Sequence, residues 1–215
     1  YIAFYHHKLW IEAYLPIEVQ FLTKLIANNF ISAVLMFVMA YVYWRYMDGS
    51  VSNHFYGFTS KGVNLKPYFA MILIMLPLIY YASHQPDFLR SYPVYYAHDA
   101  LTYFKVPEWI LVLVFEVNYG FDFVATELFF RGLLVIGLSR YMGSACVLPM
   151  VTTYCFIHFG KPFGEALSSI LGGYVLGIFA YKTRSIYGGV IIHLAVAYMM
   201  EVGGYLGNRY FIELP

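Results

Sequence analysis

Charged residues are scarce in this chain of 215 residues. Only 12% are Asp, Glu, Lys or Arg, whereas a soluble domain carries roughly 25%. Hydrophobic residues make up 61%, and the mean hydropathy is +0.63. Most of the chain must therefore lie where charge is costly, and a bilayer is the simplest such place. The net charge of +1 argues against nucleic-acid binding, which requires a basic face.

Cysteines and repeats are also few. Cys146 and Cys155 are too far apart for a CxxC metal or redox motif, and both are expected to be small apolar residues of one hydrophobic segment. No internal repeat is visible. A length of 215 residues allows one domain or two small ones, and we expect a single transmembrane domain over residues 1–215. Within it, residues 1–105 carry no diagnostic motif, and residues 106–205 form a motif-bearing core of catalytic type.

Six long apolar segments each predict a membrane-spanning helix. They cover residues 21–44, 67–82, 107–141, 146–158, 165–181 and 187–205. The third would reach about 50 Å as one helix, so it must tilt, protrude or break near Gly120, and a break would make seven spans. Gly173 and Gly177 are expected to permit close helix contact. The sequence thus predicts an all-α polytopic membrane protein, a bundle of six to seven transmembrane helices.

Ionisable residues interrupt these apolar segments, although each costs about 2.5–3.5 kcal/mol at a helix centre. In TELFFRGLL, Glu127 and Arg131 are four residues apart and share one helix face. One interpretation is an ion pair that only stabilises the bundle. The other is that Arg131 holds Glu127 ionised and oriented as a general base.

A predicted turn in CFIHFGKPFGE lies between His158 and Glu165, because Gly160 and Pro162 end the fourth segment. The His158 imidazole is therefore expected at a break where water can enter, although histidines near helix ends are often only interfacial. Glu165 is expected either to cap the next helix, whose N-terminus favours a carboxylate, or to take part in chemistry.

No other charged residue lies between Arg184 and Glu201 around His193. A histidine inside the membrane needs a partner from another helix, and the available ones are Glu127, Arg131 and His158. One carboxylate and two histidines suit two chemistries. They could activate a water, with a histidine donor at the oxyanion. Alternatively, Glu127, His158 and His193 could hold a divalent metal such as zinc. The sequence leaves both open.

Three stretches in order, ELFFRGLL, FIHFGKP and KTRSIYGGVIIH, resemble the motif series of the CAAX prenyl protease and bacteriocin-processing (CPBP or Abi) family of intramembrane endopeptidases. The resemblance covers roughly residues 120 to 200. Thr126 stands where the family has the first Glu of a pair, and Ala197 stands where an amide or acid is expected. The chain resembles the branch with a single Glu and an acid after the second motif.

The resemblance implies a peptide hydrolase whose catalytic residues are Glu127, His158 and His193. Glu127 would polarise a water with help from His158, and His193 would donate a hydrogen bond to the oxyanion. Arg131 would orient Glu127, and Glu165 would be a supporting or alternate acid.

The implied partners are membrane lipids and a peptide or protein substrate, with or without a lipid, and the implied location is the bacterial cytoplasmic membrane. Two alternatives stay open. A non-catalytic protein of the same fold, with a bacteriocin-immunity or partner-binding role, would tolerate Thr126 and Ala197. A proton-coupled transporter would also place Glu, His and Arg in a bundle core.

Overall fold

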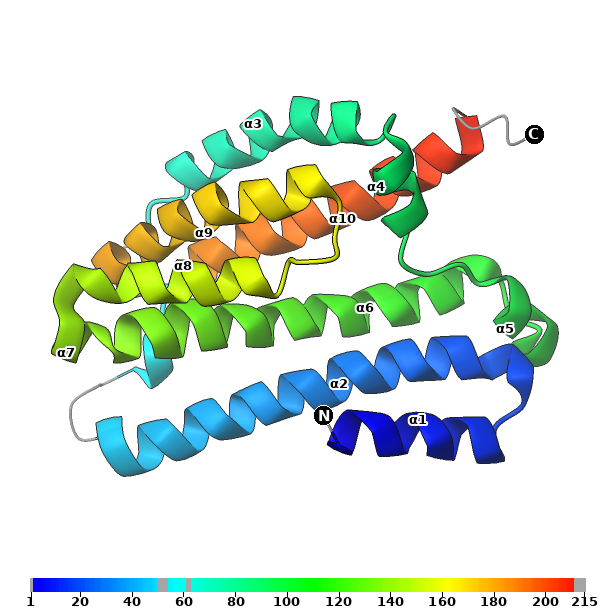
Figure 1. Cartoon of the computed structure of the whole chain (residues 1–215), viewed down its shortest axis with the longest axis horizontal. Coiled ribbons are helices and arrows are strands. Elements are labelled where there is room, and N and C mark those ends of the chain that lie inside the picture. Colours follow the sequence, from blue (N-terminus) through cyan, green and yellow to red (C-terminus); the bar gives the residue numbers. More distant parts are fainter. Residues whose placement is uncertain (1, 50–53, 61–62, 211–215) are drawn as a thin grey trace.

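The structure is a computed structural model that describes residues 2–49, 54–60 and 63–210 (Figure 1). All the regular elements in these residues are helical. In chain order they are α1 (Ile2–Tyr14), α2 (Ile17–Tyr43), η1 (Trp44–Asp48), η2 (Phe55–Gly57), α3 (Lys66–Ala82), α4 (Pro86–Ser91), α5 (His98–Phe104), α6 (Glu108–Glu127), η3 (Leu128–Gly137), α7 (Ser139–Met142), η4 (Gly143–Cys146), α8 (Val147–Phe156), α9 (Phe163–Thr183) and α10 (Tyr187–Tyr210).

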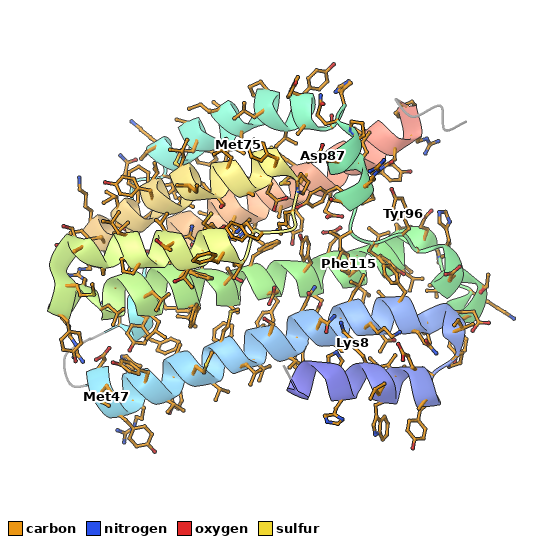
Figure 2. The ribbon with its side chains drawn as sticks, in the orientation of Figure 1. Lys8, Met47, Met75, Asp87, Tyr96 and Phe115 are labelled. Atoms are coloured by element: carbon orange, nitrogen blue, oxygen red, sulfur yellow. The ribbon has the colours of Figure 1, made fainter. Side chains whose placement is uncertain are left out.

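The long helices lie roughly along one axis as a bundle (Figure 1). α2 packs against α6, α8 against α9, and α3 against α10. Phe115 of α6 is completely buried and belongs to the apolar cluster between α6, α2 and α5 (Figure 2). The chain therefore folds as side-by-side helices that bury one apolar face each, as the pattern of six apolar segments predicts.

Three helical stretches in the described residues are long and apolar enough to cross a membrane, namely Ile17–Asp48 (α2 with η1), α9 and α10. α3 is a shorter apolar helix. The predicted all-α membrane fold is confirmed, and the chain is an integral membrane protein. The number of six to seven spans stays a prediction, because length and hydropathy identify only these three.

The third apolar segment does not break at Gly120. α6 continues through it and joins η3, a π-helical segment that begins directly after Glu127. Gly120 lies where a Cβ would collide with the Tyr198 hydroxyl of α10, and that hydroxyl donates to the Glu116 carbonyl oxygen at 3.1 Å. The glycine thus lets a tyrosine approach the α6 backbone, and the hypothesis of a break was wrong.

The two glycines of α9 behave as predicted. A Cβ on Gly173 would lie 3.0 Å from the Tyr154 ring, and one on Gly177 would lie 2.6 Å from Met150 Cε. α8 and α9 can pack closely because neither position carries a side chain. The prediction that Gly173 and Gly177 permit close helix contact is confirmed.

The loop after α2 closes one end of the bundle. Tyr56 adopts a left-handed backbone conformation (φ 40°) and is buried against the glycine face of η3. Its ring lies 2.9 Å from where a Cβ on Gly137 would be, and its hydroxyl donates to Asp48 Oδ2 at 2.6 Å. The neighbouring Gly57 carbonyl accepts from the Ile186 amide at 3.1 Å. This loop therefore joins η1, η3 and the residue just before α10.

The shorter helices α1, α4 and α5 were not predicted. Their segments mix polar, aromatic and proline residues, so none shows an apolar run of membrane length. α1 packs on α2 through Glu12 and Lys24, whose carboxylate and ammonium groups lie 2.6 Å apart. No feature of the structure tests the predicted division at residue 105.

Candidate active site

Glu127 and His193 meet between α6 and α10. Glu127 is the last residue of α6, and its side chain is completely buried. His193 Nδ1 lies 2.9 Å from Glu127 Oε1. A carboxylate ionised by Arg131 can only accept, so Nδ1 carries the hydrogen in this contact. The inter-helix partner that His193 was expected to need is therefore Glu127.

Arg131 pairs with the same carboxylate oxygen. Its Nη1 lies 2.9 Å from Glu127 Oε1, and both side chains are buried. The guanidinium carbon also lies 4.3 Å from the centroid of the Tyr154 ring, within the range of a cation–π interaction. A charge at this depth is tolerated because it has both a counter-ion and an aromatic face.

Two glycines at the start of α10 make room for this arrangement. A Cβ on Gly189 would collide with Glu127 Oε2, and a Cβ on Gly188 would collide with the ring of Tyr68 from α3. The carboxylate therefore lies against bare backbone. Sequence reasoning missed Gly188, Gly189 and Tyr68, although the Gly-Gly pair before VIIH was a visible signal of close approach.

His158 lies in the turn after α8 and is buried. Its Nδ1 is 2.8 Å from the Tyr154 carbonyl oxygen, which can only accept, so Nδ1 carries the hydrogen here too. The Tyr154 ring centroid lies 4.5 Å from that of His158 and 6.2 Å from that of His193. The structure thus joins Glu127 to His193 directly, and it places His158 beside them across Tyr154.

Glu165 lies in the first turn of α9, but it does not cap the helix. The N-cap residue is Pro162, and no side-chain hydrogen bond caps it. The two Glu165 oxygens instead accept from Lys161 Nζ at 2.6 Å and from the Tyr92 hydroxyl at 2.7 Å. The expectation of a helix cap was wrong, because nearer donors on two other segments take the carboxylate.

The proposed metal ligands do not form a donor set in this arrangement. In the described part of the chain, no three His, Cys, Asp or Glu side chains are grouped so that they could hold a metal ion. Glu127, His158 and His193 are not grouped in this way, so they do not fit a shared zinc ion.

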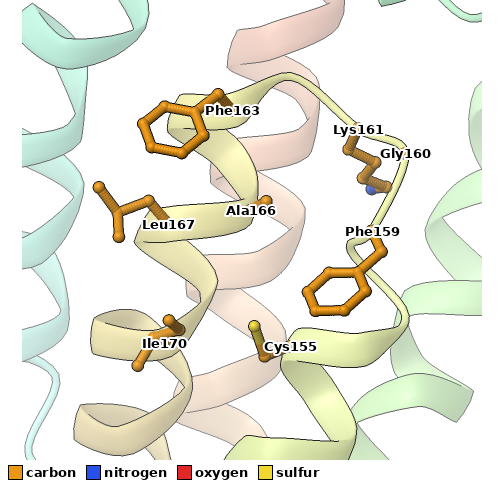
Figure 3. A pocket seen from close by; sticks show the side chains of 8 residues that line it. All are labelled: Cys155, Phe159, Gly160, Lys161, Phe163, Ala166, Leu167 and Ile170. Carbon is orange, nitrogen blue, oxygen red and sulfur yellow. The ribbon is translucent and has the colours of Figure 1, made fainter.

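A groove of about 400 Å³ opens beside the turn that carries His158 (Figure 3). It lies between the end of α8 and the start of α9, and its lining is mostly apolar. The lining residues are Cys155, Phe159, Gly160, Lys161, Phe163, Ala166, Leu167 and Ile170. Lys161 is the one charged residue among them, so the groove presents an apolar surface with a single cation.

Residues 107–199 match the family described as type II CAAX prenyl endopeptidase Rce1-like. No curated protein and no solved structure matches the chain. The matched segment contains Glu127, His158 and His193. The predicted resemblance to CAAX prenyl proteases is confirmed over these residues, which are similar to a family of peptidases.

Proposed function

We propose that the chain is an intramembrane endopeptidase. The proposal starts from the match of residues 107–199 to the type II CAAX prenyl endopeptidase Rce1-like family. One observation carries this proposal most directly. Glu127 and His193 come from two helices of the matched segment, and their side chains meet at 2.9 Å inside the bundle. A carboxylate that orients an imidazole is a recurrent arrangement for activating a nucleophile.

The difference in exposure of Glu127 and His193 supports an assignment of which group acts on water. The Glu127 side chain is 0% exposed, whereas that of His193 is 14% exposed. Because Nδ1 carries the hydrogen bonded to Glu127, Nε2 of the neutral ring is free to accept a proton. His193 is therefore the general base in this proposal, and Glu127 orients the ring and stabilises the imidazolium. This differs from the roles expected from the sequence, in which Glu127 polarises the water and His193 donates to the oxyanion.

The proton moves in two steps. His193 Nε2 takes it from the attacking water as the new C–O bond forms, and the imidazolium returns it to the leaving amine as the C–N bond breaks. Arg131 keeps Glu127 ionised throughout. His158 donates from Nδ1 to the Tyr154 carbonyl oxygen, so Nε2 of its neutral ring can accept a hydrogen bond from the attacking water and help to position it.

Buried atoms without partners support a hydrolytic site. Glu127 Oε2 and the three guanidinium nitrogens of Arg131 have no hydrogen-bond partner among the described protein atoms, although all are buried. The 2.9 Å contact of Arg131 Nη1 counts as an ion pair but lacks hydrogen-bond geometry. Buried polar groups of this kind are usually satisfied by ordered water. In this proposal such water would complete the support of the Glu127 carboxylate, whereas the attacking water lies at Nε2 of His193.

In this proposal, residues 106–205 supply the site and residues 1–105 supply supporting helices in the bacterial cytoplasmic membrane. The substrate is a peptide or protein that reaches the site from the bilayer. The groove beside His158 offers an apolar surface for part of it. Prenylated C-termini, leader peptides and membrane anchors all share this apolar character.

The complete burial of Glu127 also supports a second candidate, a non-catalytic membrane protein in which Glu127, Arg131 and His193 only hold the bundle together. That protein would fold with the same contacts and would bind a partner without cleaving it. The two candidates differ in whether any peptide bond is hydrolysed.

The test is turnover of fluorogenic peptides, lipidated and unlipidated, by the purified protein in lipid vesicles. Glu127→Gln and His193→Gln are each expected to lower kcat by about 10²–10⁴-fold. Glu12→Gln is the matched control, because it removes an exposed ion pair with Lys24 on α1 and α2. Wild-type turnover by Glu127→Gln would show that the assignment is wrong.

A further inference from the structure

Tyr92 lies outside the matched segment, in the loop between α4 and α5, and it reaches the turn region of the site. Its side chain is buried, and its hydroxyl donates to Glu165 Oε2 at 2.7 Å. The two residues are 73 positions apart in the sequence. A hydrogen bond to a carboxylate is among the stronger ones in proteins, so this contact fixes the loop to the start of α9.

The loop end of this contact is anchored to α10. Asn208 Nδ2 donates to the Tyr92 carbonyl oxygen at 2.8 Å and to the Leu89 carbonyl oxygen at 3.1 Å. The Val94 amide donates to Glu201 Oε2 at 3.0 Å. Gly204 packs so closely that a Cβ there would collide with the Tyr92 backbone. Tyr92 is therefore a rigid support rather than part of a free loop.

The other end of the contact leads to His158. Glu165 Oε1 accepts from Lys161 Nζ at 2.6 Å, and the Lys161 amide donates to the His158 carbonyl oxygen at 3.2 Å. Between them, Gly160 has a positive φ of 93°, which other residues rarely adopt. A continuous chain of bonds thus runs from α10 through Tyr92, Glu165 and Lys161 to the turn that carries His158.

The Tyr92 hydroxyl keeps its proton at ordinary pH, so it remains a hydrogen-bond donor. Burial, together with the nearby Glu165 carboxylate, raises the pKa of Tyr92 above its usual value. The hydroxyl therefore stays protonated and keeps donating to Glu165.

We propose that Tyr92 is a positioning residue that, through Glu165 and Lys161, holds the turn bearing His158 in place against α10. The effect on catalysis rests on the proposed function, whereas the effect on the turn does not. Removal of the hydroxyl frees the turn to move away from α10, and His158 then leaves its place beside Tyr154 and His193.

Cys155 reports on the turn without any assay of activity. Its side chain lines the groove near Phe159 (Figure 3), whereas Cys146 is completely buried. Tyr92→Phe is expected to speed alkylation of Cys155 by a small maleimide roughly tenfold, because a hydrogen bond to a charged group is lost and the turn opens more often.

Tyr198→Phe is the matched control, because it removes another tyrosine hydroxyl that bonds between α10 and α6 but has no link to the turn. It is expected to label at the wild-type rate. Lys161→Gln is the second variant, since Lys161 is 39% exposed and its loss should leave folding intact. It should also speed labelling. Wild-type labelling rates in Tyr92→Phe and Lys161→Gln overturn the proposal.

Turnover gives the catalytic readout. Tyr92→Phe is expected to lower kcat roughly tenfold with KM unchanged, because it displaces a group that acts after substrate binds. Adding Glu165→Gln should cause little further loss, since both changes break one chain of bonds. Faster labelling with an unchanged kcat overturns the catalytic role of Tyr92. Faster labelling in a chain whose wild type cleaves no peptide supports the anchoring of the turn and overturns the proposed function instead.

Discussion

The carboxylate of Glu127 and the guanidinium of Arg131 lie 2.9 Å apart, on consecutive helical turns, with both side chains buried. Neither charge has water at the protein surface to solvate it, so each depends on the other for its stability. The same Glu127 oxygen also contacts His193 Nδ1 at 2.9 Å. The ion pair therefore links the electrostatics of α6 and η3 to the placement of a histidine on α10.

Arg131→Met is expected to destabilise the protein by about 3–5 kcal/mol, because it leaves a buried carboxylate without its counter-ion. The midpoint of thermal unfolding in detergent, followed by circular dichroism, measures this. Adding Glu127→Gln should recover part of the loss, since no buried charge then remains on this pair. Arg90→Met on the exposed surface of α4 is the control and should leave the midpoint unchanged. A stable Arg131→Met single variant would contradict the dependence of the two charges on each other.

Gly189→Ala is expected to displace the Glu127 carboxylate, because the new methyl group would occupy the position of Oε2. Overpacking of this kind costs about 1–3 kcal/mol. Turnover should fall as well, since His193 loses its oriented partner. Gly172→Ala on α9 is the control, because no heavy atom beyond its chain neighbours and the nearby backbone of its own helix lies within 4 Å of its Cβ position. That variant should be neutral or more stable by up to about 1 kcal/mol. Equal behaviour of the two variants would show that α10 can shift freely at Gly189.

Tyr56→Phe is expected to lower stability by about 1–3 kcal/mol, because it leaves Asp48 without a buried hydrogen bond of 2.6 Å. The same melting experiment measures the change. Tyr46→Phe is the control, since Tyr46 is close to Asp48 in sequence but exposed. If both variants have the same unfolding midpoint as the wild type, the loop that carries Tyr56 does not stabilise this end of the bundle.

The pH dependence of stability should also report on Tyr56. Burial, followed by the hydrogen bond and charge of Asp48, raises the pKa of its hydroxyl in the folded state. In the unfolded chain a tyrosine ionises near pH 10. The contribution of Tyr56 is therefore fully present below about pH 10 and is lost as the pH rises above it. The wild-type melting temperature should fall more steeply between about pH 9 and 11 than that of Tyr56→Phe, and parallel curves would refute this.

Local sequence patterns were sufficient to predict features that depend on the geometry of a single helix. The spacing of Glu127 and Arg131 places them on one face of any helix. Gly173 and Gly177 lack side chains, so they permit close packing whichever helix lies against α9. The isolation of His193 in an apolar segment required a partner from another helix, and the structure supplies Glu127. These predictions rest on helix periodicity and on the cost of an unpaired polar group, and neither depends on the route of the chain.

Predictions that depended on neighbours were less successful. Gly120 was read as a weak point in a long helix, but it accommodates Tyr198 of α10. Glu165 was expected to cap α9, but Tyr92 from a distant loop takes one of its oxygens. In each case the outcome depended on a residue from a distant segment that sequence spacing cannot identify.

The sequence by itself determined that this chain is a bundle of apolar helices. It also determined that Glu127, Arg131 and two histidines lie in the motif-bearing segment. Hydrophobicity and helical periodicity act along the chain, so they can be read without the fold. Only the tertiary structure decided that Glu127 is buried behind His193, that Gly189 makes room for it, and that Tyr92 reaches Glu165. Those contacts depend on which helices are neighbours and on how far each is shifted along its axis relative to the next. Packing between segments that are distant in the sequence sets both.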